Sequence, residues 1–160
     1  MKPRPTVFVE TTVLSYLVSR KAREQIYAAR QTLTRAWWKQ RHEFALFTST
    51  TVRAECELGD PREVTKRLAV AGTMGLLQLT AEAEDLGEAL VKLGALPEKA
   101  QTDALHLAVA AVGRMEFVAS WNYRHLINRH IQQQVFRIMQ HRGYNMPEVR
   151  TPEGLLEVIR

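Results

Sequence analysis

The sequence of 160 residues contains a single cysteine, Cys56, and has no long hydrophobic run. One cysteine excludes an internal disulfide and a cysteine-based metal cluster. A membrane-spanning helix needs about 20 consecutive apolar residues, and no stretch approaches that length. The start, MKPRPTVFVE, lacks the charged-then-apolar layout of a signal peptide. We therefore expect a cytoplasmic protein with no membrane partner.

Motifs of several common hydrolases are also missing. The histidines show no paired metal-ligand spacing such as H-E-x-x-H. The chain has neither a G-x-S-x-G nucleophile elbow nor a G-x-x-x-x-G-K-[ST] phosphate-binding loop. These absences count against a serine hydrolase and a nucleoside-triphosphatase.

What the sequence does contain is an ordinary globular composition with a basic balance. Apolar residues make up 46% and charged residues 24%, as in soluble globular proteins. The length suits a single domain spanning residues 1–160 with its own core. A net charge of +5 and a pI of about 9.7 favour polyanionic partners such as RNA or DNA, although many basic proteins bind no nucleic acid.

Short apolar runs rich in β-branched or aromatic residues alternate with longer helical patterns. The expected strands span residues 6–10, 45–49, 75–80, 116–120 and, as a fifth candidate, 148–151. The expected helices span residues 12–18, 21–41, 50–58, 61–71, 81–93, 103–113, 123–129 and 131–142, with a last short helix capped by Thr151. This alternation predicts an α/β fold of three layers, α/β/α, with a central parallel sheet of four or five strands.

Two candidate site residues stand where expected strands end. Glu10 follows the apolar run 7–9, and Asn122 comes just past the run 116–120. Ligands of open α/β sheets bind beyond the carboxyl ends of the strands. Glu10 and Asn122 are therefore neighbours if the first and fourth strands are adjacent.

Glu55 lies on an apolar helical face. In a helix over residues 50–58, Val52, Glu55 and Cys56 share one side. A charge beside an apolar stripe is costly unless a metal ion or a hydrogen-bond network compensates it. A solvated position at the rim of the helix explains the same spacing equally well.

The stretch EKAQTDALHLAVAAVG, residues 98–113, is the most informative. Thr102 is the expected N-cap, which puts Asp103 in the first helical turn, where the helix dipole favours a carboxylate. A helix start alone explains Asp103. Yet residues 104–112 are apolar almost all round, so we expect a buried helix that aims Asp103 at a pocket. His106 is either a satisfied core histidine or a group that supports Asp103 or contacts a phosphate.

Arg124 and His125 follow Asn122 directly. They belong either to a solvated loop or to a surface that contacts a phosphate backbone.

Glu10, Glu55 and Asp103, converging with Asn122, would make a site in which every ligand is an oxygen. Such ligands suit Mg²⁺ or Mn²⁺ rather than Zn²⁺. A site of this kind polarises a phosphodiester, holds a water as nucleophile and stabilises the leaving oxygen. A basic surface around the acidic pocket would draw nucleic acid toward it.

Four segments together are typical of a known family: TVFVETTVLSYL, TSTTVRAECELGD, LPEKAQTDALHLAVAA and FVASWNYRHLIN, in order from residue 6 to residue 128. The chain resembles the PIN-domain family, specifically its VapC-type toxin-like branch. The resemblance implies a compact α/β/α domain and metal-dependent endoribonuclease chemistry. It also implies that Glu10, Glu55 and Asp103 bind Mg²⁺ or Mn²⁺, that a small antitoxin protein blocks the site, and that the chain forms a homodimer.

The chain departs from the family pattern at three positions. Glu10 stands where an Asp is usual, Asn122 replaces a fourth acid, and Thr102 stands where a further acid is often found. We expect a metal-dependent ribonuclease, the toxin-like component of a type II toxin–antitoxin pair. Its catalytic residues would be Glu10, Glu55, Asp103 and Asn122.

The residues expected to bind substrate are Thr11, which would orient Glu10 or a bound water, and Arg124 and His125, which would contact RNA. The thinned acidic set leaves an alternative: a PIN-fold module, weak or inactive as a catalyst, that binds RNA or a protein partner. A third alternative is a structural oligomeric protein whose acids are surface or capping residues.

Overall fold

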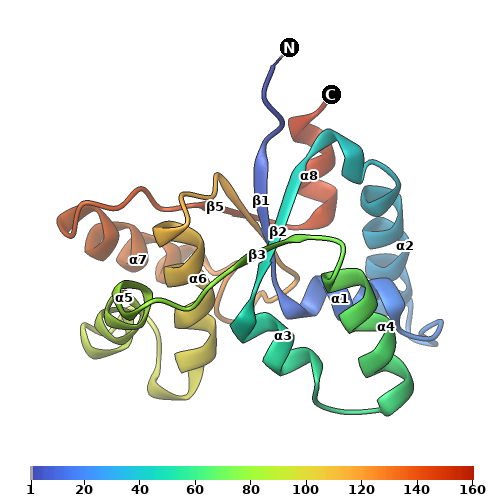
Figure 1. Cartoon of the computed structure of the whole chain (residues 1–160), viewed down its shortest axis with the longest axis horizontal. Helices are drawn as coiled ribbons and strands as arrows, with labels where there is room; N and C mark the ends of the chain where they lie inside the picture. Colours follow the sequence, from blue (N-terminus) through green and yellow to red (C-terminus); the bar gives the residue numbers. More distant parts are fainter. Residues whose placement is uncertain (1) are drawn as a thin grey trace.

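A five-stranded sheet runs through the centre of the computed structural model, which describes residues 2–160 (Figure 1). Across the sheet the strands follow the order β3 (Gly75–Leu77), β2 (Ala45–Ser49), β1 (Thr6–Val9), β4 (Phe117–Ala119) and β5 (Glu148–Arg150). All four neighbouring pairs are parallel. The predicted α/β fold with a parallel central sheet is confirmed.

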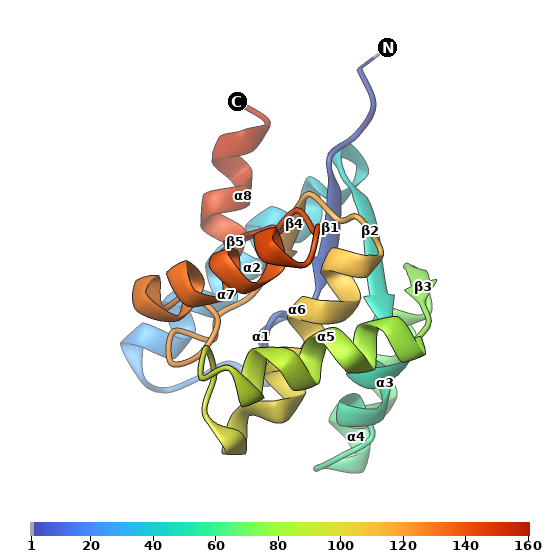
Figure 2. The ribbon, with the colours of Figure 1, turned by 90° about the vertical axis from the view of Figure 1, so that its left-hand side faces the viewer.

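Helices cover both faces of this sheet (Figures 1 and 2). One face carries α5 (Ala81–Lys92), α6 (Gln101–Val112) and α7 (Arg129–His141). The other carries α1 (Thr11–Val18), α2 (Gln25–Lys39), α4 (Pro61–Ala71) and α8 (Pro152–Val158). The short helix α3 (Thr50–Cys56) follows β2 directly, and the 3₁₀ turns are η1 (Arg41–Glu43) and η2 (Glu98–Ala100). Across residues 2–160, none of the helices combines the length and the apolar composition of a membrane span.

The centre of the core is formed by β1 and α6. Val7, Phe8 and Val9 have no exposed surface, as expected of a parallel strand covered on both faces. The predicted burial of α6 is also confirmed, since seven of its residues, His106 among them, are buried. α5 packs closely on α6 at Gly87, where a Cβ would lie 3.0 Å from the Leu105 side chain.

The expected helix over 123–129 is wrong, because residues 123–127 form turns. The amides of Leu126 and Ile127 both donate to the backbone carbonyl of Asn122, and the bond from Ile127 closes a wider turn than that of an α-helix. α7 begins only at Arg129, where the Asn128 side chain accepts the Ile131 amide as an N-cap.

Two further helix starts differ from expectation. Thr102 is not the N-cap of α6, because η2 runs directly into a helix that already begins at Gln101. Asp103 nevertheless lies in the first turn. α2 starts at Gln25 rather than at residue 21, and the buried side chain of Gln31 binds the backbone of Arg20 and Ala22 in the irregular segment before it.

Truncation of Leu90 tests the packing of α5. Leu90 has no exposed surface, whereas Leu93, just past the helix end, is 62% exposed. We expect Leu90→Ala to lower the free energy of unfolding by about 2–5 kcal/mol, because it leaves a cavity. Leu93→Ala should change it by less than about 0.5 kcal/mol. Urea unfolding of both variants measures the difference, and equal losses would contradict this packing.

Candidate active site

The candidate site lies at the carboxyl ends of β1 and β4. The chain builds the sheet outward from β1 to β2 and β3 on one side, and then continues with β4 and β5 on the other side. β1 stands between β2 and β4, and the crevice at the carboxyl ends of such central strands is the usual ligand site of an open α/β sheet. β1 and β4 are adjacent, which is the condition under which Glu10 and Asn122 were expected to be neighbours. The Glu10 amide donates to the Ala119 carbonyl at 3.3 Å, so Glu10 lies directly beyond β1 at the end of β4.

Glu10 is a buried carboxylate, with 2% of its surface exposed. It is the N-cap of α1, and its Oε1 accepts the Thr12 amide at 3.0 Å and the Thr12 hydroxyl. Thr12 Oγ1 in turn accepts the Trp121 amide at 2.9 Å. Thr12 therefore orients Glu10, a role that the sequence had suggested for Thr11.

Burial controls the protonation of Glu10. The pKa of the Glu10 carboxyl is raised from 4.5 to about 7, chiefly by burial and to a smaller extent by the negative charge of Asp103. His106 and the hydroxyls of Thr12 and Ser120 lower the pKa only in part. Near neutral pH the Glu10 carboxyl is therefore partly protonated unless a cation other than His106 lies close to it.

Glu55 belongs to a hydrogen-bond network, one of the two interpretations left open above. Its Oε1 accepts the Thr11 hydroxyl at 2.5 Å and lies 2.6 Å from Nε2 of His106. Burial raises the pKa of Glu55, but the hydrogen bond and charge of His106 and the hydrogen bond from Thr11 outweigh it and lower the pKa. Thr11 and His106 thus keep Glu55 ionised.

His106 is a buried histidine that supports Glu55 rather than Asp103. Its ring lies 6.1 Å from the ring of Phe8 in β1, and the residue has no exposed surface. Within residues 2–160, its Nδ1 has no hydrogen-bond partner, so Nε2 makes the one polar contact of the ring.

Asp103 is paired with His125. Its Oδ2 lies 2.9 Å from Nδ1 of His125, and both side chains are mostly buried. The Asn122 side-chain carbonyl accepts the His125 amide at 2.9 Å, which shapes the turn that brings the imidazole to Asp103. The next residue back, Arg124, is exposed. No motif or spacing in the sequence predicted the pairing of Asp103 with His125.

The residues present fit a hard divalent ion that keeps much of its water. In the part of the chain described, no three His, Cys, Asp or Glu side chains lie close enough together to hold a metal ion unaided. Mg²⁺, however, usually binds proteins through one or two carboxylates and retains several waters. Glu10 and Asp103 are near enough for one charge to raise the pKa of the other, and a cation would relieve that repulsion.

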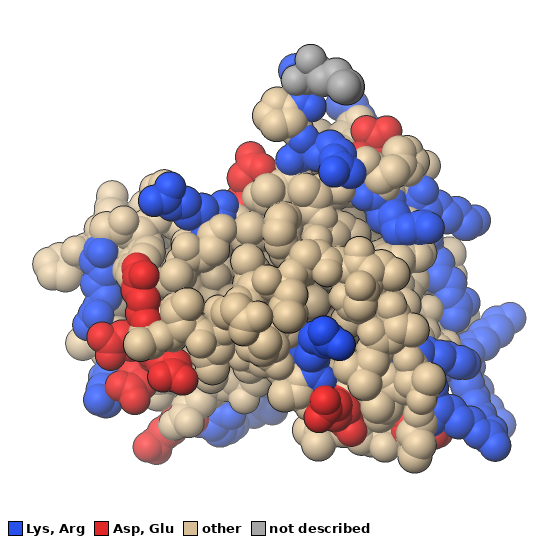
Figure 3. All heavy atoms as spheres, viewed as in Figure 1, with Lys and Arg blue, Asp and Glu red and all other residues tan. Residues whose placement is uncertain are grey.

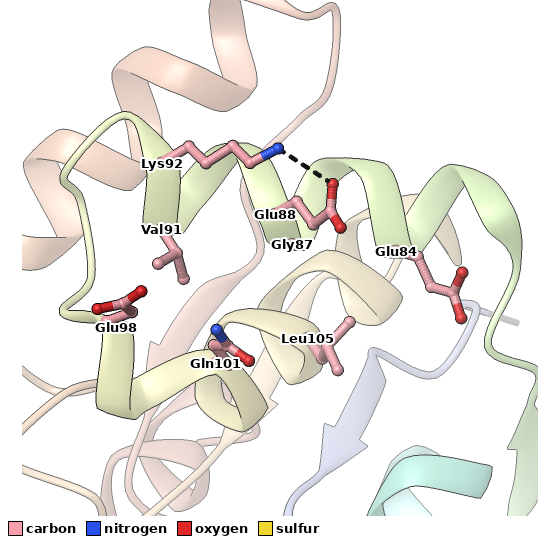
Figure 4. A pocket seen from close by; sticks show the side chains of 8 residues that line it. All are labelled: Glu84, Gly87, Glu88, Val91, Lys92, Glu98, Gln101 and Leu105. Atoms are coloured by element: carbon pink, nitrogen blue, oxygen red, sulfur yellow. Dashed lines mark ion pairs between the residues drawn. The ribbon is translucent and has the colours of Figure 1, made fainter.

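A separate cavity of about 350 Å³ lies between α5 and α6 (Figure 4). Leu105 and Gln101 of α6 face it from one side. Glu88 and Lys92 of α5, whose charged groups are 3.6 Å apart, face it from the other. None of the predicted site residues lines this cavity.

Solved structures with the same architecture decide the fold. VapC20 of Mycobacterium tuberculosis, a toxin that cleaves the sarcin–ricin loop, matches with a TM-score of 0.59 and 17% identity, over 74% of this chain and 91% of that chain. The chain has the fold of a VapC-type PIN domain. VapBC2 of Rickettsia felis, solved with a DNA fragment from its promoter, matches this chain with a TM-score of 0.54 and 10% identity, over 91% of this chain and 98% of that chain. No protein-family model and no curated protein sequence matches this chain.

Replacement of Glu10 tests how its burial affects the stability of the folded chain. The carboxyl binds its proton more tightly in the folded than in the unfolded chain, so its contribution to stability is complete below about pH 4.5 and is lost as the pH rises through about 7. Glu10→Gln removes this titration. At about pH 8 we expect the variant to be more stable than the wild type by about 1–3 kcal/mol.

Urea unfolding in EDTA, repeated across this pH range, measures the effect. The matched control is Glu57→Gln, since Glu57 is an exposed glutamate at the end of α3. Its stability should follow the wild-type pH dependence. A Glu10→Gln curve with the same slope as the wild type would show that Glu10 is not held with a raised pKa.

Proposed function

We propose that this PIN-fold protein is a metal-dependent endoribonuclease and the toxin-like component of a toxin–antitoxin pair. One observation carries the proposal. Glu10, Glu55 and Asp103 come from three separate elements and are linked around Glu10: the charges of His106 and Asp103 both act on its pKa, and His106 lies 2.6 Å from Glu55. The shared fold with VapC20, an RNA-cleaving toxin, supports RNA as the substrate.

In this proposal Glu10, Glu55 and Asp103 would hold Mg²⁺ or Mn²⁺, directly or through water. When bound, the ion would polarise the scissile phosphodiester and lower the pKa of the attacking water. The protein's own contribution is orientation. His125 fixes Oδ2 of Asp103, and His106 with Thr11 fixes Oε1 of Glu55. Partners of this kind hold metal-binding carboxylates in place and are important for affinity.

Asn122 contributes through the backbone turn, because its carbonyl oxygen binds the His125 amide. In this proposal a second lone pair of the same oxygen completes the catalytic site. Arg124 is exposed beside it and would contact an RNA phosphate, a role that the +5 net charge supports. His125 would approach the substrate from its place beside Asp103.

The partners are inferred from the fold. The likeness to VapBC2, which was solved bound to a DNA fragment from its promoter, supports an antitoxin partner, and we infer that it would cover the acidic site of this chain. We also infer a homodimer, as the resemblance to VapC-type proteins implies, and a cytoplasmic location.

One observation favours the alternative of an inactive PIN-fold module. No three potential metal ligands among residues 2–160 are close enough to hold an ion by themselves. Such a module would bind RNA or a protein without cleaving RNA.

Calorimetric titration with Mn²⁺ distinguishes the two functions. We expect saturable binding to the wild type, and binding weaker by about tenfold or more for Asp103→Asn, because a charged oxygen ligand is lost. The matched control is Asp85→Asn, an exposed aspartate of α5, which should bind as the wild type does. Thermal unfolding checks that all three proteins are folded.

If the wild type binds no Mn²⁺ at millimolar concentration, the result contradicts the metal-dependent ribonuclease and supports the inactive PIN-fold module. If it binds Mn²⁺ and Asp103→Asn binds equally well, the metal site lies elsewhere. Metal-dependent RNA cleavage, lost in Asp103→Asn and retained in Asp85→Asn, completes the test.

A further inference from the structure

An arginine surrounded by aromatic rings lies next to the carboxylate site. The guanidinium carbon of Arg30 is 5.1 Å from the ring centre of Tyr123, 5.6 Å from that of Trp121 and 5.9 Å from that of Tyr27. Its Nη1 also donates to the Tyr16 hydroxyl at 3.3 Å. We refer to Tyr16, Tyr27, Arg30, Trp121 and Tyr123 as the Arg30 cluster.

The cluster has a rigid floor and two exposed rings. Trp121 is 5% exposed, and its indole N–H donates to the Thr34 hydroxyl at 2.8 Å. Tyr16 packs edge-on against Trp121, with ring centres 6.0 Å apart. Above this floor, Tyr27 is 43% and Tyr123 49% exposed, so both present ring surface to solvent. Tyr27 also lies 6.4 Å from Tyr16 between ring centres, but about half of the surface of Tyr27 and Tyr123 remains open to solvent.

The segment from Trp121 to His125 joins the cluster to the site. At one end the Trp121 amide donates to Thr12, whose hydroxyl binds Glu10. At the other end His125 contacts Asp103. Tyr123 lies midway between these two anchors, so a molecule stacked on it would lie beside the proposed catalytic carboxylates.

The surroundings of the cluster are basic. The segment between α1 and α2 exposes Arg20, Lys21 and Arg23 and one acid, Glu24. Lys and Arg side chains also gather along the edge of the molecule beside α2 (Figure 3). Arg124 adds an exposed cation next to Tyr123. Such a surface attracts the phosphates of a nucleic acid.

We propose that the Arg30 cluster is a stacking platform for the unpaired bases of single-stranded RNA whose backbone crosses the carboxylate site. Rings of Tyr and the plane of an Arg are the groups on which proteins stack single-stranded bases. Bases inside a duplex hide these faces, so the platform selects unpaired over paired RNA. The inference rests on the proposed ribonuclease function and specifies its substrate class.

The experiment measures binding with cleavage switched off. An unstructured, fluorescently labelled RNA of about ten nucleotides is titrated with the full-length protein in EDTA, and the same strand is tested after annealing to its complement. Fluorescence anisotropy gives both affinities. The variants are Tyr27→Ala/Tyr123→Ala, which removes the exposed rings, and Tyr27→Phe/Tyr123→Phe, which keeps them.

The matched control is Phe136→Ala. Phe136 is an aromatic residue of α7 that is 50% exposed and lies outside the cluster. We expect the alanine pair to weaken binding of single-stranded RNA by about tenfold or more, and the phenylalanine pair and the control to stay within about twofold of the wild type. The duplex should bind the wild type less tightly than the single strand does.

The platform is overturned if the wild type does not bind single-stranded RNA, or if the alanine pair binds it as tightly as the wild type does. A wild-type protein that binds the duplex more tightly than the single strand would also overturn it. If the alanine pair instead loses only the capture of an antitoxin-like protein, the rings belong to a protein interface and the platform is equally overturned. Failure of the proposed ribonuclease function gives a different result from failure of the platform. If RNA binding depends on the two rings but no cleavage follows when Mn²⁺ is added back, the platform is supported and the ribonuclease activity is contradicted.

Discussion

The arrangement at the carboxyl end of the sheet depends on one buried carboxylate, that of Glu10. A charged group with almost no exposed surface is costly unless neighbouring groups compensate it. Thr12, Ser120 and His106 do so in part, and they come from the start of α1, the end of β4 and the middle of α6. Compensating this one charge thus ties together three elements that are remote in sequence. The positive end of the α1 dipole adds to the same effect, because Glu10 is the N-cap.

The other two acids are held separately. Glu55 binds Thr11 and His106, and Asp103 binds His125. As a result the three carboxylates have different environments. Burial raises the pKa of Glu10, whereas His106 and Thr11 lower the pKa of Glu55 against the effect of its own burial. Glu10 therefore has a pKa of about 7, whereas the pKa of Glu55 is lowered. Acids with pKa values shifted in this way are common at functional sites.

The sequence predicted the layers, the parallel sheet and the positions of the three acids on their elements, because these depend on local apolar patterns. It did not predict which groups hold the acids. His106 and Glu55 are 51 residues apart and His125 and Asp103 are 22 apart, so only the folded sheet brings them together. Local backbone geometry explains why Thr12, rather than the expected Thr11, binds Glu10. Both follow Glu10, and the turn into α1 decides which hydroxyl faces it.

A cluster of acids repels the phosphates that a nuclease must admit. In the proposed function, a cation bound close to Glu10 and Asp103 would offset this repulsion only locally. Base stacking involves no phosphate charge, so contacts to Tyr27 and Tyr123 would position an RNA strand without bringing its backbone against unneutralised carboxylates. The Arg30 side chain would serve the same end, since its charge would attract the strand while its guanidinium lies against the rings of Tyr123 and Trp121. Anchoring through the bases and activation through the carboxylates would then take place at separate positions, joined by the single segment from Trp121 to His125.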